Sequence, residues 1–217
     1  MSATKRRKEL QKKGRGAKFV PDEEPKQKES REIHRLLQVL GGKAKRKKLL
    51  SPKGMNVRPM MEVVKGAAFD ILQVAGGCPA SLRPGRWLDL YSGTGSVGIE
   101  AISRGCSEVH FVEMDPWVFW MSIGKDEPFD YISVTPPYTQ VDYGVLMDQI
   151  SKSALIGKDT FIVVEYPIRT DMLESCGCLV KIKDRRFGRT HLAIYGPEWA
   201  KKKRKSEKTL QTVVGKV

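Results

Sequence analysis

The chain has 217 residues, of which 39 are Lys or Arg and 25 are Asp or Glu, so its formal net charge is +14. Hydrophobic residues make up 40%, which suffices for one packed core and excludes disorder throughout the chain. No apolar run approaches the ~20 residues that span a bilayer, which excludes a helical membrane protein. The four cysteines lack the C-x-x-C spacing typical of zinc sites, so we expect reduced thiols, no metal and an intracellular protein.

The positive charge is concentrated at the two ends of the chain. Residues 1–53 carry a net charge of +12 and residues 199–217 carry +6, whereas residues 54–198 carry −4. Such extensions usually contact a polyanion, because each neutralised phosphate releases counterions. The alternative is that they are solvated tails or a nuclear import signal. We expect disordered basic tails at residues 1–32 and 199–217 around one domain at residues 33–198.

In chain order, the first expected element lies within residues 31–50, where an apolar run, Gly41-Gly42 and a basic stretch indicate either a short helix or a strand that enters a glycine turn. Residues 60–75 have apolar residues at helical spacing between Pro59 and Gly76-Gly77, which predicts a helix.

The remaining pattern alternates strands with helices. Further strands are expected within residues 86–90, 107–115, 129–138 and 159–167, with helices after residue 95 and at 143–155. Residues 178–197 read as a closing hairpin with Phe187-Gly188 near its turn. This alternation predicts a parallel α/β sheet with antiparallel strands added at its edge.

A glycine-rich turn within residues 88–98 (LDLYSGTGSVG) separates the first parallel strand from its helix. Its G-x-G-x-x-G pattern is shared by several kinds of nucleotide-binding protein. Asp89 would repel a pyrophosphate but could accept a hydrogen bond from an amine, and Glu113, which ends the next strand, could bind both hydroxyls of a ribose. This pair of acids favours S-adenosylmethionine (SAM) over NAD. The alternative for Asp89 is a structural carboxylate that caps the turn.

A second candidate segment, Thr135-Pro136-Pro137-Tyr138, follows the strand at residues 129–134. The prolines lack N–H donors and leave carbonyl groups free at a strand end, where α/β proteins bind ligands. Tyr138 could stack on a flat base. The Glu165-Tyr166-Pro167 segment could reach the site from the end of the fourth strand, but a strand-end turn is the favoured interpretation.

Together these motifs resemble the RsmD-type ribosomal RNA guanine-N2 methyltransferases of bacteria and their organellar relatives. The similarity covers roughly residues 37–197, in segments at Gly41–Leu50, Val57–Phe69, Leu88–Glu100, Glu113–Asp115, Phe129–Tyr138, Val164-Glu165 and Arg186–Tyr195. The resemblance implies a Rossmann-like methyltransferase sheet, SAM as the cofactor, and a guanine amine of small-subunit ribosomal RNA as the substrate. It also implies a monomer whose partner is ribosomal RNA or a precursor of the small ribosomal subunit.

The resemblance also implies which residues form the sites. The implied cofactor site uses Asp89, Tyr91, Ser92, Gly93, Gly95 and Glu113. The implied target-base site uses Thr135, Pro136, Pro137 and Tyr138, and the implied RNA-phosphate contacts are Lys43, Lys45, Arg46, Lys47, Lys48 and Arg58.

Two features depart from the family pattern. The family usually has Asp or Asn where this chain has Thr135, which predicts weaker polarisation of the amine. Only 15 residues, 114–128, join the second and third parallel strands, where this fold normally has a helix, a strand and another helix. We therefore expect an internal deletion after the second strand, and the alternative is a shortened natural loop whose aromatic residues fill the vacated space.

Two functions remain open at this stage. The first is SAM-dependent methyl transfer to the N2 amine of a guanine in small-subunit ribosomal RNA, with either full or impaired activity. The alternative is a catalytically inactive RNA-binding protein on a truncated methyltransferase fold. An NAD-dependent oxidoreductase is disfavoured, because no suitable acid–base residue is evident and the Pro-Pro-Tyr segment would have no role. By resemblance the compartment is a plastid or other organelle, with cytoplasm and nucleus left open.

Overall fold

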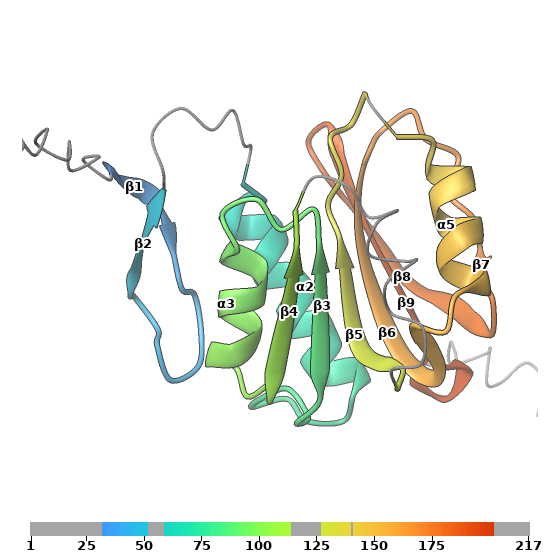
Figure 1. Cartoon of the computed structure of the whole chain (residues 1–217), viewed down its shortest axis with the longest axis horizontal. Helices are drawn as coiled ribbons and strands as arrows, with labels where there is room; N and C mark the ends of the chain where they lie inside the picture. Colours follow the sequence, from blue (N-terminus) through green and yellow to red (C-terminus); the bar gives the residue numbers. More distant parts are fainter. Residues whose placement is uncertain (1–31, 52–58, 114–126, 140, 202–217) are drawn as a thin grey trace, which may run out of the picture. The chain divides into compact units, whose positions relative to one another are not determined.

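The computed structural model describes residues 32–51, 59–113, 127–139 and 141–201 (Figure 1). Residues 1–31 of the expected N-terminal tail, most of the tail at 199–217, Arg58 and most of the short connection after Glu113 therefore lie outside the described residues. The elements in chain order are β1 (Glu32–Gln38), β2 (Lys48–Ser51), α2 (Glu62–Ala75), β3 (Arg86–Leu90), α3 (Ser96–Ser103), β4 (Glu108–Val112), β5 (Phe129–Val134), α5 (Tyr143–Lys152), β6 (Ile156–Pro167), β7 (Ser175–Cys176), β8 (Leu179–Phe187), β9 (Thr190–Gly196) and the 3₁₀-helix η1 (Glu198–Ala200).

In the described part of the chain, seven strands form one sheet in the order β4-β3-β5-β6-β9-β8-β7. Strands β4, β3, β5 and β6 are mutually parallel. Strand β9 is antiparallel to both β6 and β8 and lies between them. The β8–β9 turn includes Gly188 at φ 62°, a conformation that glycine adopts without strain. The predicted parallel α/β sheet with a C-terminal antiparallel hairpin is confirmed.

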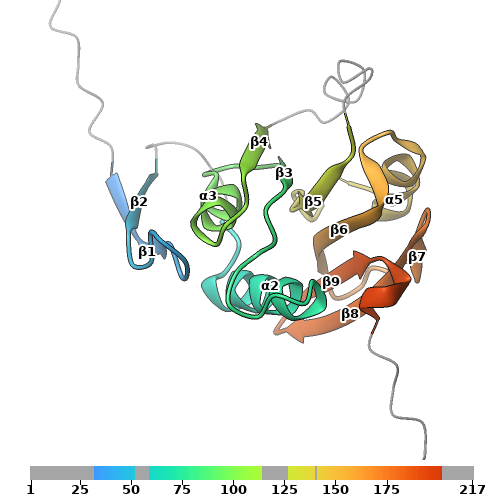
Figure 2. The same ribbon diagram turned by 90° about the horizontal axis from the view of Figure 1, so that it is seen from below.

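Helices cover both faces of this sheet (Figure 2). Helices α2 and α3 pack on one face, where Val64, Phe69 and Leu72 of α2 and Ala101 of α3 join the core around Trp87. Helix α5 covers the other face with an apolar stripe that includes Leu146, Met147 and Ile150. The predicted helix at residues 60–75 is confirmed as α2, which begins shortly after Pro59 and ends at Gly76.

The N-terminal segment is a separate two-stranded antiparallel hairpin of β1 and β2, so the strand alternative for residues 31–50 is confirmed. Leu37, Val39 and Leu49 form a small buried cluster, against which Ile99 of α3 packs. This cluster attaches the hairpin to α3.

Two features concern the C-terminal end of the fold and one edge of its sheet. The fold continues past the expected end at residue 198, because Trp199 of η1 packs on Phe161 and donates a hydrogen bond to Asp159. At one edge of the sheet, β4 is the terminal strand, and β5 lies on the opposite side of β3. Within the described ranges no strand pairs with the outer side of β4, and Phe111 is 49% exposed.

Candidate active site

The predicted cofactor and target-base residues meet at the carboxyl ends of β3, β4 and β5. The strand order reverses at this point. Strand β4 pairs with one side of β3, and the next strand along the chain, β5, pairs with the other side. Ligands of open α/β sheets bind at such a switch point. The loop after β3 contacts both neighbours: Ser92 N donates to the Val112 carbonyl over 3.0 Å, and the Thr135 hydroxyl donates to the Tyr91 carbonyl over 3.2 Å.

The loop after β3 has an unusual backbone path. Tyr91, Gly93 and Gly95 all have positive φ angles, of 60°, 51° and 69°. For Tyr91 this conformation costs about 1–2 kcal/mol, because its Cβ approaches the following carbonyl oxygen. A Cβ at position 95 would lie 3.2 Å from the Phe111 ring, so glycine is favoured there by space as well as by φ. The glycine pattern was visible in the sequence, but nothing in it signalled the strained Tyr91.

Asp89 lies beneath this loop and is fully buried. One carboxylate oxygen accepts the Gly98 N–H at 3.0 Å and the other accepts the Ser133 hydroxyl at 2.5 Å. Ser133 in turn accepts the Trp87 indole N–H at 2.9 Å. Burial raises the pKa of Asp89 to about 7, although the bonds from Ser133 and Gly98 act in the opposite direction.

Asp89 therefore fixes the start of α3 against β3 and β5, as the structural-carboxylate alternative predicts. Because the side chain is fully buried and both of its oxygens have partners, it supports the loop from below. Direct contact between Asp89 and a cofactor amine stays a prediction.

Glu113 directly follows β4 and is exposed at the rim of the site. Its carboxylate accepts a hydrogen bond from the Gly93 N–H, so it faces the glycine turn as the sequence predicts. An ionised carboxylate has about four acceptor positions, which leaves capacity for the two hydroxyls of a ribose.

The target-base segment leaves the end of β5 beside the same loop. Pro136 is buried and Pro137 is exposed. The Tyr138 hydroxyl donates to Glu165 Oε1 over 2.5 Å and lies 2.8 Å from Thr190 Oγ1. These contacts fix the tip of the tyrosine side chain to β6 and to the start of β9.

Glu165 thus contacts the target-base segment, which agrees with the less favoured of the two sequence interpretations. It lies inside β6, so the favoured interpretation of Glu165-Tyr166-Pro167 as a strand-end turn is wrong. The available signal was an acidic residue after an apolar run, since a buried carboxylate requires a partner. Its partner, Tyr138, lies 27 residues away in sequence.

The predicted RNA-binding residues form a second group. They are exposed in the loop between β1 and β2 and at the start of β2: Lys43, Lys45, Arg46, Lys47 and Lys48. The Ala44 N–H donates to Ser103 Oγ over 2.9 Å, so this loop lies at the end of α3 opposite to the glycine turn. With eight residues, α3 is about 12 Å long.

Three general features of the described residues concern metal ligands, thiols and membrane-spanning helices. Within them, no group of three His, Cys, Asp or Glu side chains could hold a metal ion. All four cysteines are free thiols. In this part of the chain no helix has the length and apolar character required to cross a membrane.

Comparison with known proteins gives a consistent result. The family model described as "Conserved hypothetical protein 95" matches residues 37–121 and 118–196. Its break falls in the stretch where an internal deletion is predicted. The chain is 26% identical over 186 residues to YlbH of Bacillus subtilis (strain 168), a protein assigned to the rRNA methyltransferases, and the match covers 73% of this chain and 98% of YlbH. It is 23% identical over 151 residues to the ribosomal RNA small subunit methyltransferase D of Buchnera aphidicola, with 58% of this chain and 76% of that protein covered.

Solved structures show the same fold. A protein of Escherichia coli, yhhF, assigned to the methyltransferases, has a TM-score of 0.57 at 19% identity over 74% of this chain and 97% of its own. A hypothetical protein of Thermus thermophilus has a TM-score of 0.58 at 23% identity over 72% of this chain and 97% of its own. A more distant methyltransferase structure, with a TM-score of 0.51 at 8% identity over 69% of this chain and 53% of its own, was solved as a complex with SAH.

Proposed function

Because the chain belongs to the RsmD-like family of ribosomal RNA methyltransferases, we propose that it transfers a methyl group from SAM to the N2 amine of a guanine in small-subunit ribosomal RNA. One observation carries this proposal. The glycine turn after β3, Glu113 after β4 and the Thr-Pro-Pro-Tyr segment after β5 meet at one edge of the sheet, bridged by the Gly93–Glu113 and Tyr91–Thr135 hydrogen bonds.

The residues present fit SAM. Glu113 offers an exposed carboxylate for the ribose hydroxyls next to the Gly93 N–H. Gly93 and Gly95 let a ligand approach the backbone closely, and Asp89 holds the loop in place from below. When bound, SAM supplies a methyl group that its sulfonium has already activated.

The protein's task is then mainly to position the substrate amine. In the proposed arrangement Thr135 and the Pro136 carbonyl accept hydrogen bonds from the guanine amine, which turns its lone pair toward the methyl group. Tyr138 stacks on the base after it has left the RNA stack. Support comes from the contacts of Tyr138 with Glu165 and Thr190, which order this side chain before any base arrives.

We further propose that the protein acts inside the cell as a monomer. Four free thiols suit a reducing compartment. The resemblance to organellar relatives makes an organelle the first compartment to examine.

The test combines binding with product analysis. The full chain is titrated calorimetrically with SAH, then incubated with radiolabelled SAM and small-subunit ribosomal RNA, and the labelled nucleoside is identified by mass spectrometry. We expect micromolar binding and N2-methylguanosine. SAH binding without transfer would contradict the proposed reaction, and RNA binding without SAH binding would support the inactive RNA-binding alternative. Glu113→Gln should weaken SAH binding, whereas Asp171→Asn, an exposed substitution outside the site, is the matched control.

A further inference from the structure

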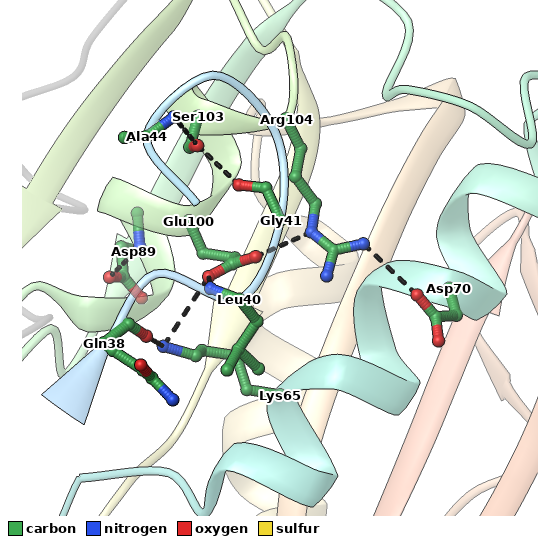
Figure 3. Close-up of polar contacts among 11 residues, drawn as sticks. Gln38, Leu40, Gly41, Ala44, Lys65, Asp70, Asp89, Glu100, Ser103 and Arg104 are labelled. Carbon is green, nitrogen blue, oxygen red and sulfur yellow. Dashed lines mark hydrogen bonds and ion pairs between the residues drawn. The ribbon is translucent and has the colours of Figure 1, made fainter. Parts of the chain in front are cut away.

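A buried polar cluster joins the loop at residues 38–44 to helices α2 and α3 (Figure 3). Lys65 of α2 donates to the Gln38 carbonyl over 3.0 Å and lies 3.8 Å from Glu100 Oε2. The same Glu100 oxygen accepts the Leu40 N–H at 2.7 Å, and its other oxygen accepts Arg104 Nε at 2.7 Å. We call Lys65, Glu100, Ser103 and Arg104 the docking cluster.

Ser103 extends these contacts along the loop. Its hydroxyl donates to the Gly41 carbonyl over 2.6 Å and accepts the Ala44 N–H at 2.9 Å. Its carbonyl accepts the Lys43 N–H at 2.8 Å. The docking cluster therefore holds the connection between β1 and β2, which we call the basic loop, through backbone groups of Gln38, Leu40, Gly41, Lys43 and Ala44. The cationic side chains of this loop, those of Lys43, Lys45, Arg46 and Lys47, stay exposed.

The charges of the docking cluster are costly to bury. The Lys65 and Glu100 side chains are 1% and 0% exposed. Burial lowers the pKa of Lys65, and the nearby Glu100 opposes this shift. A buried ion pair is often no more stabilising than an apolar pair, and its best-attested role is to select one arrangement of the chain.

The loop backbone is itself shaped for one position. Gly42 has φ +74°, and a Cβ added there would lie 1.8 Å from the Ser103 carbonyl oxygen, so the loop approaches α3 as closely as a backbone can. Arg46 also has a left-handed φ of 72° although it is not glycine. Hydrogen bonds from Arg46 N to the Val39 carbonyl (2.8 Å) and from Val39 N to the Lys47 carbonyl (3.0 Å) maintain this conformation.

We propose that the docking cluster is a positioning device for RNA, in which Glu100, Ser103 and Lys65 hold the basic loop in one conformation so that its cations meet phosphates in register with the methyl-transfer site. This inference rests on the proposed function. Helix α3 is the connection, because its first turn is bonded to Asp89 under the glycine turn and its last turn carries Ser103. Cations are also favoured at this end by the helix dipole.

The decisive variant is Gly42→Ala, which removes no charge and no hydrogen-bonding side chain but pushes the loop off α3. Its matched control is Gly77→Ala, since Gly77 has nearly the same φ, +78°, and nothing within 4 Å of an added Cβ. Both full-length variants are compared with the wild type for binding of small-subunit ribosomal RNA by fluorescence anisotropy at several salt concentrations, and for steady-state methyl transfer.

We expect Gly42→Ala to raise the RNA Kd and KM about tenfold, with kcat and SAH affinity unchanged. The slope of log Kd against log salt should fall by about 2, which corresponds to two or three lost phosphate contacts. Gly77→Ala should bind RNA as the wild type does. Equal RNA binding by the two variants would overturn the positioning role, because a loose basic tail of unchanged charge would bind equally well.

A second pair covers the case in which Gly42→Ala does not fold. Ser103→Ala removes two hydrogen bonds to the loop, and Ser107→Ala is the control, since Ser107 is exposed. Here we expect an RNA Kd about fivefold higher than in the control, together with faster hydrogen exchange at Lys43 and Ala44. Faster exchange with unchanged RNA binding would overturn the inference. A wild-type chain that neither binds nor methylates the RNA would instead refute the proposed function.

Discussion

Replacing Asp89 by Asn tests the carboxylate that lies beneath the glycine turn. In the folded chain burial raises the pKa of Asp89 from 3.8 to about 7. The folded state therefore holds the proton more tightly than the unfolded state. The stability that the protonated carboxyl contributes is complete below about pH 3.8 and is lost as the pH rises through about 7.

The magnitude follows from this difference in pKa. The difference between a pKa of 3.8 and a pKa of about 7 corresponds to about 4 kcal/mol in the free energy of unfolding. About 2–3 kcal/mol of this stability is lost between pH 5 and pH 8. Asn has nearly the same shape and does not titrate. Its carbonyl can accept the Gly98 N–H, and its amide can donate to Ser133, whose hydroxyl can turn to the Leu88 carbonyl at 3.4 Å. The variant should therefore be the more stable protein at pH 8, and its advantage should shrink as the pH falls.

The assay is urea unfolding of wild type and Asp89→Asn at pH 5, 6, 7 and 8. We expect the difference in free energy of unfolding to grow by about 2–3 kcal/mol over this range. Asp171→Asn controls for the loss of one negative charge at an exposed position. A difference that stays constant with pH would refute the reasoning, since it would mean that Asp89 is already ionised at pH 5.

Four further predictions concern the site. Glu113→Gln should raise the Kd for SAH at least about tenfold in calorimetry, because hydrogen bonds to a charged acceptor are the stronger ones; an unchanged Kd would remove Glu113 from the cofactor site. Tyr138→Phe, which loses the bonds to Glu165 and Thr190, should lower kcat severalfold and leave SAH affinity unchanged, and a kcat equal to that of the wild type would show that these bonds do not order the ring. Thr135→Asn should raise the methylation rate a few-fold, because an amide can accept the substrate amine and still donate to the Tyr91 carbonyl; a rate that does not rise would count against this role. SAH affinity should increase from pH 6 to pH 8 as Asp89 ionises beneath the bound amine, and a flat pH profile would mean that the two groups are not coupled.

Local signals were sufficient for much of the fold. Pro59 and Gly76-Gly77 bracket α2, since Pro59 lies just before the N-cap Met61 and glycine suits the end of a helix. The glycine turn and the hairpin at Gly188 were also visible, since both need positive φ angles. The ambiguity within residues 31–50 remained, because a short apolar run fits a helix or a strand equally well.

Long-range contacts account for what the sequence did not reveal. Lys65 lies in an ordinary amphipathic pattern and would be taken for a solvent-facing lysine, yet it is fully buried and its ammonium group donates to the Gln38 carbonyl. Its partner Glu100 is 35 positions further along the chain. The bond between Tyr138 and Glu165 likewise joins the segment after β5 to β6, and the parallel pairing of these two strands brings the residues together.

The terminal position of β4 has a consequence for how this fold can lose material over evolution. Removal of a central strand would divide the sheet in two, whereas trimming beyond β4 takes hydrogen-bond partners from one side of one strand and leaves the β4-β3-β5 junction whole. Such trimming therefore lowers the solubility of the protein rather than its catalytic capacity. Within the described residues the outer edge of β4 has no partner strand and Phe111 beside it is 49% exposed, and chains add to one another on surfaces of this type, so self-association, rather than loss of the junction, is the expected consequence of such trimming.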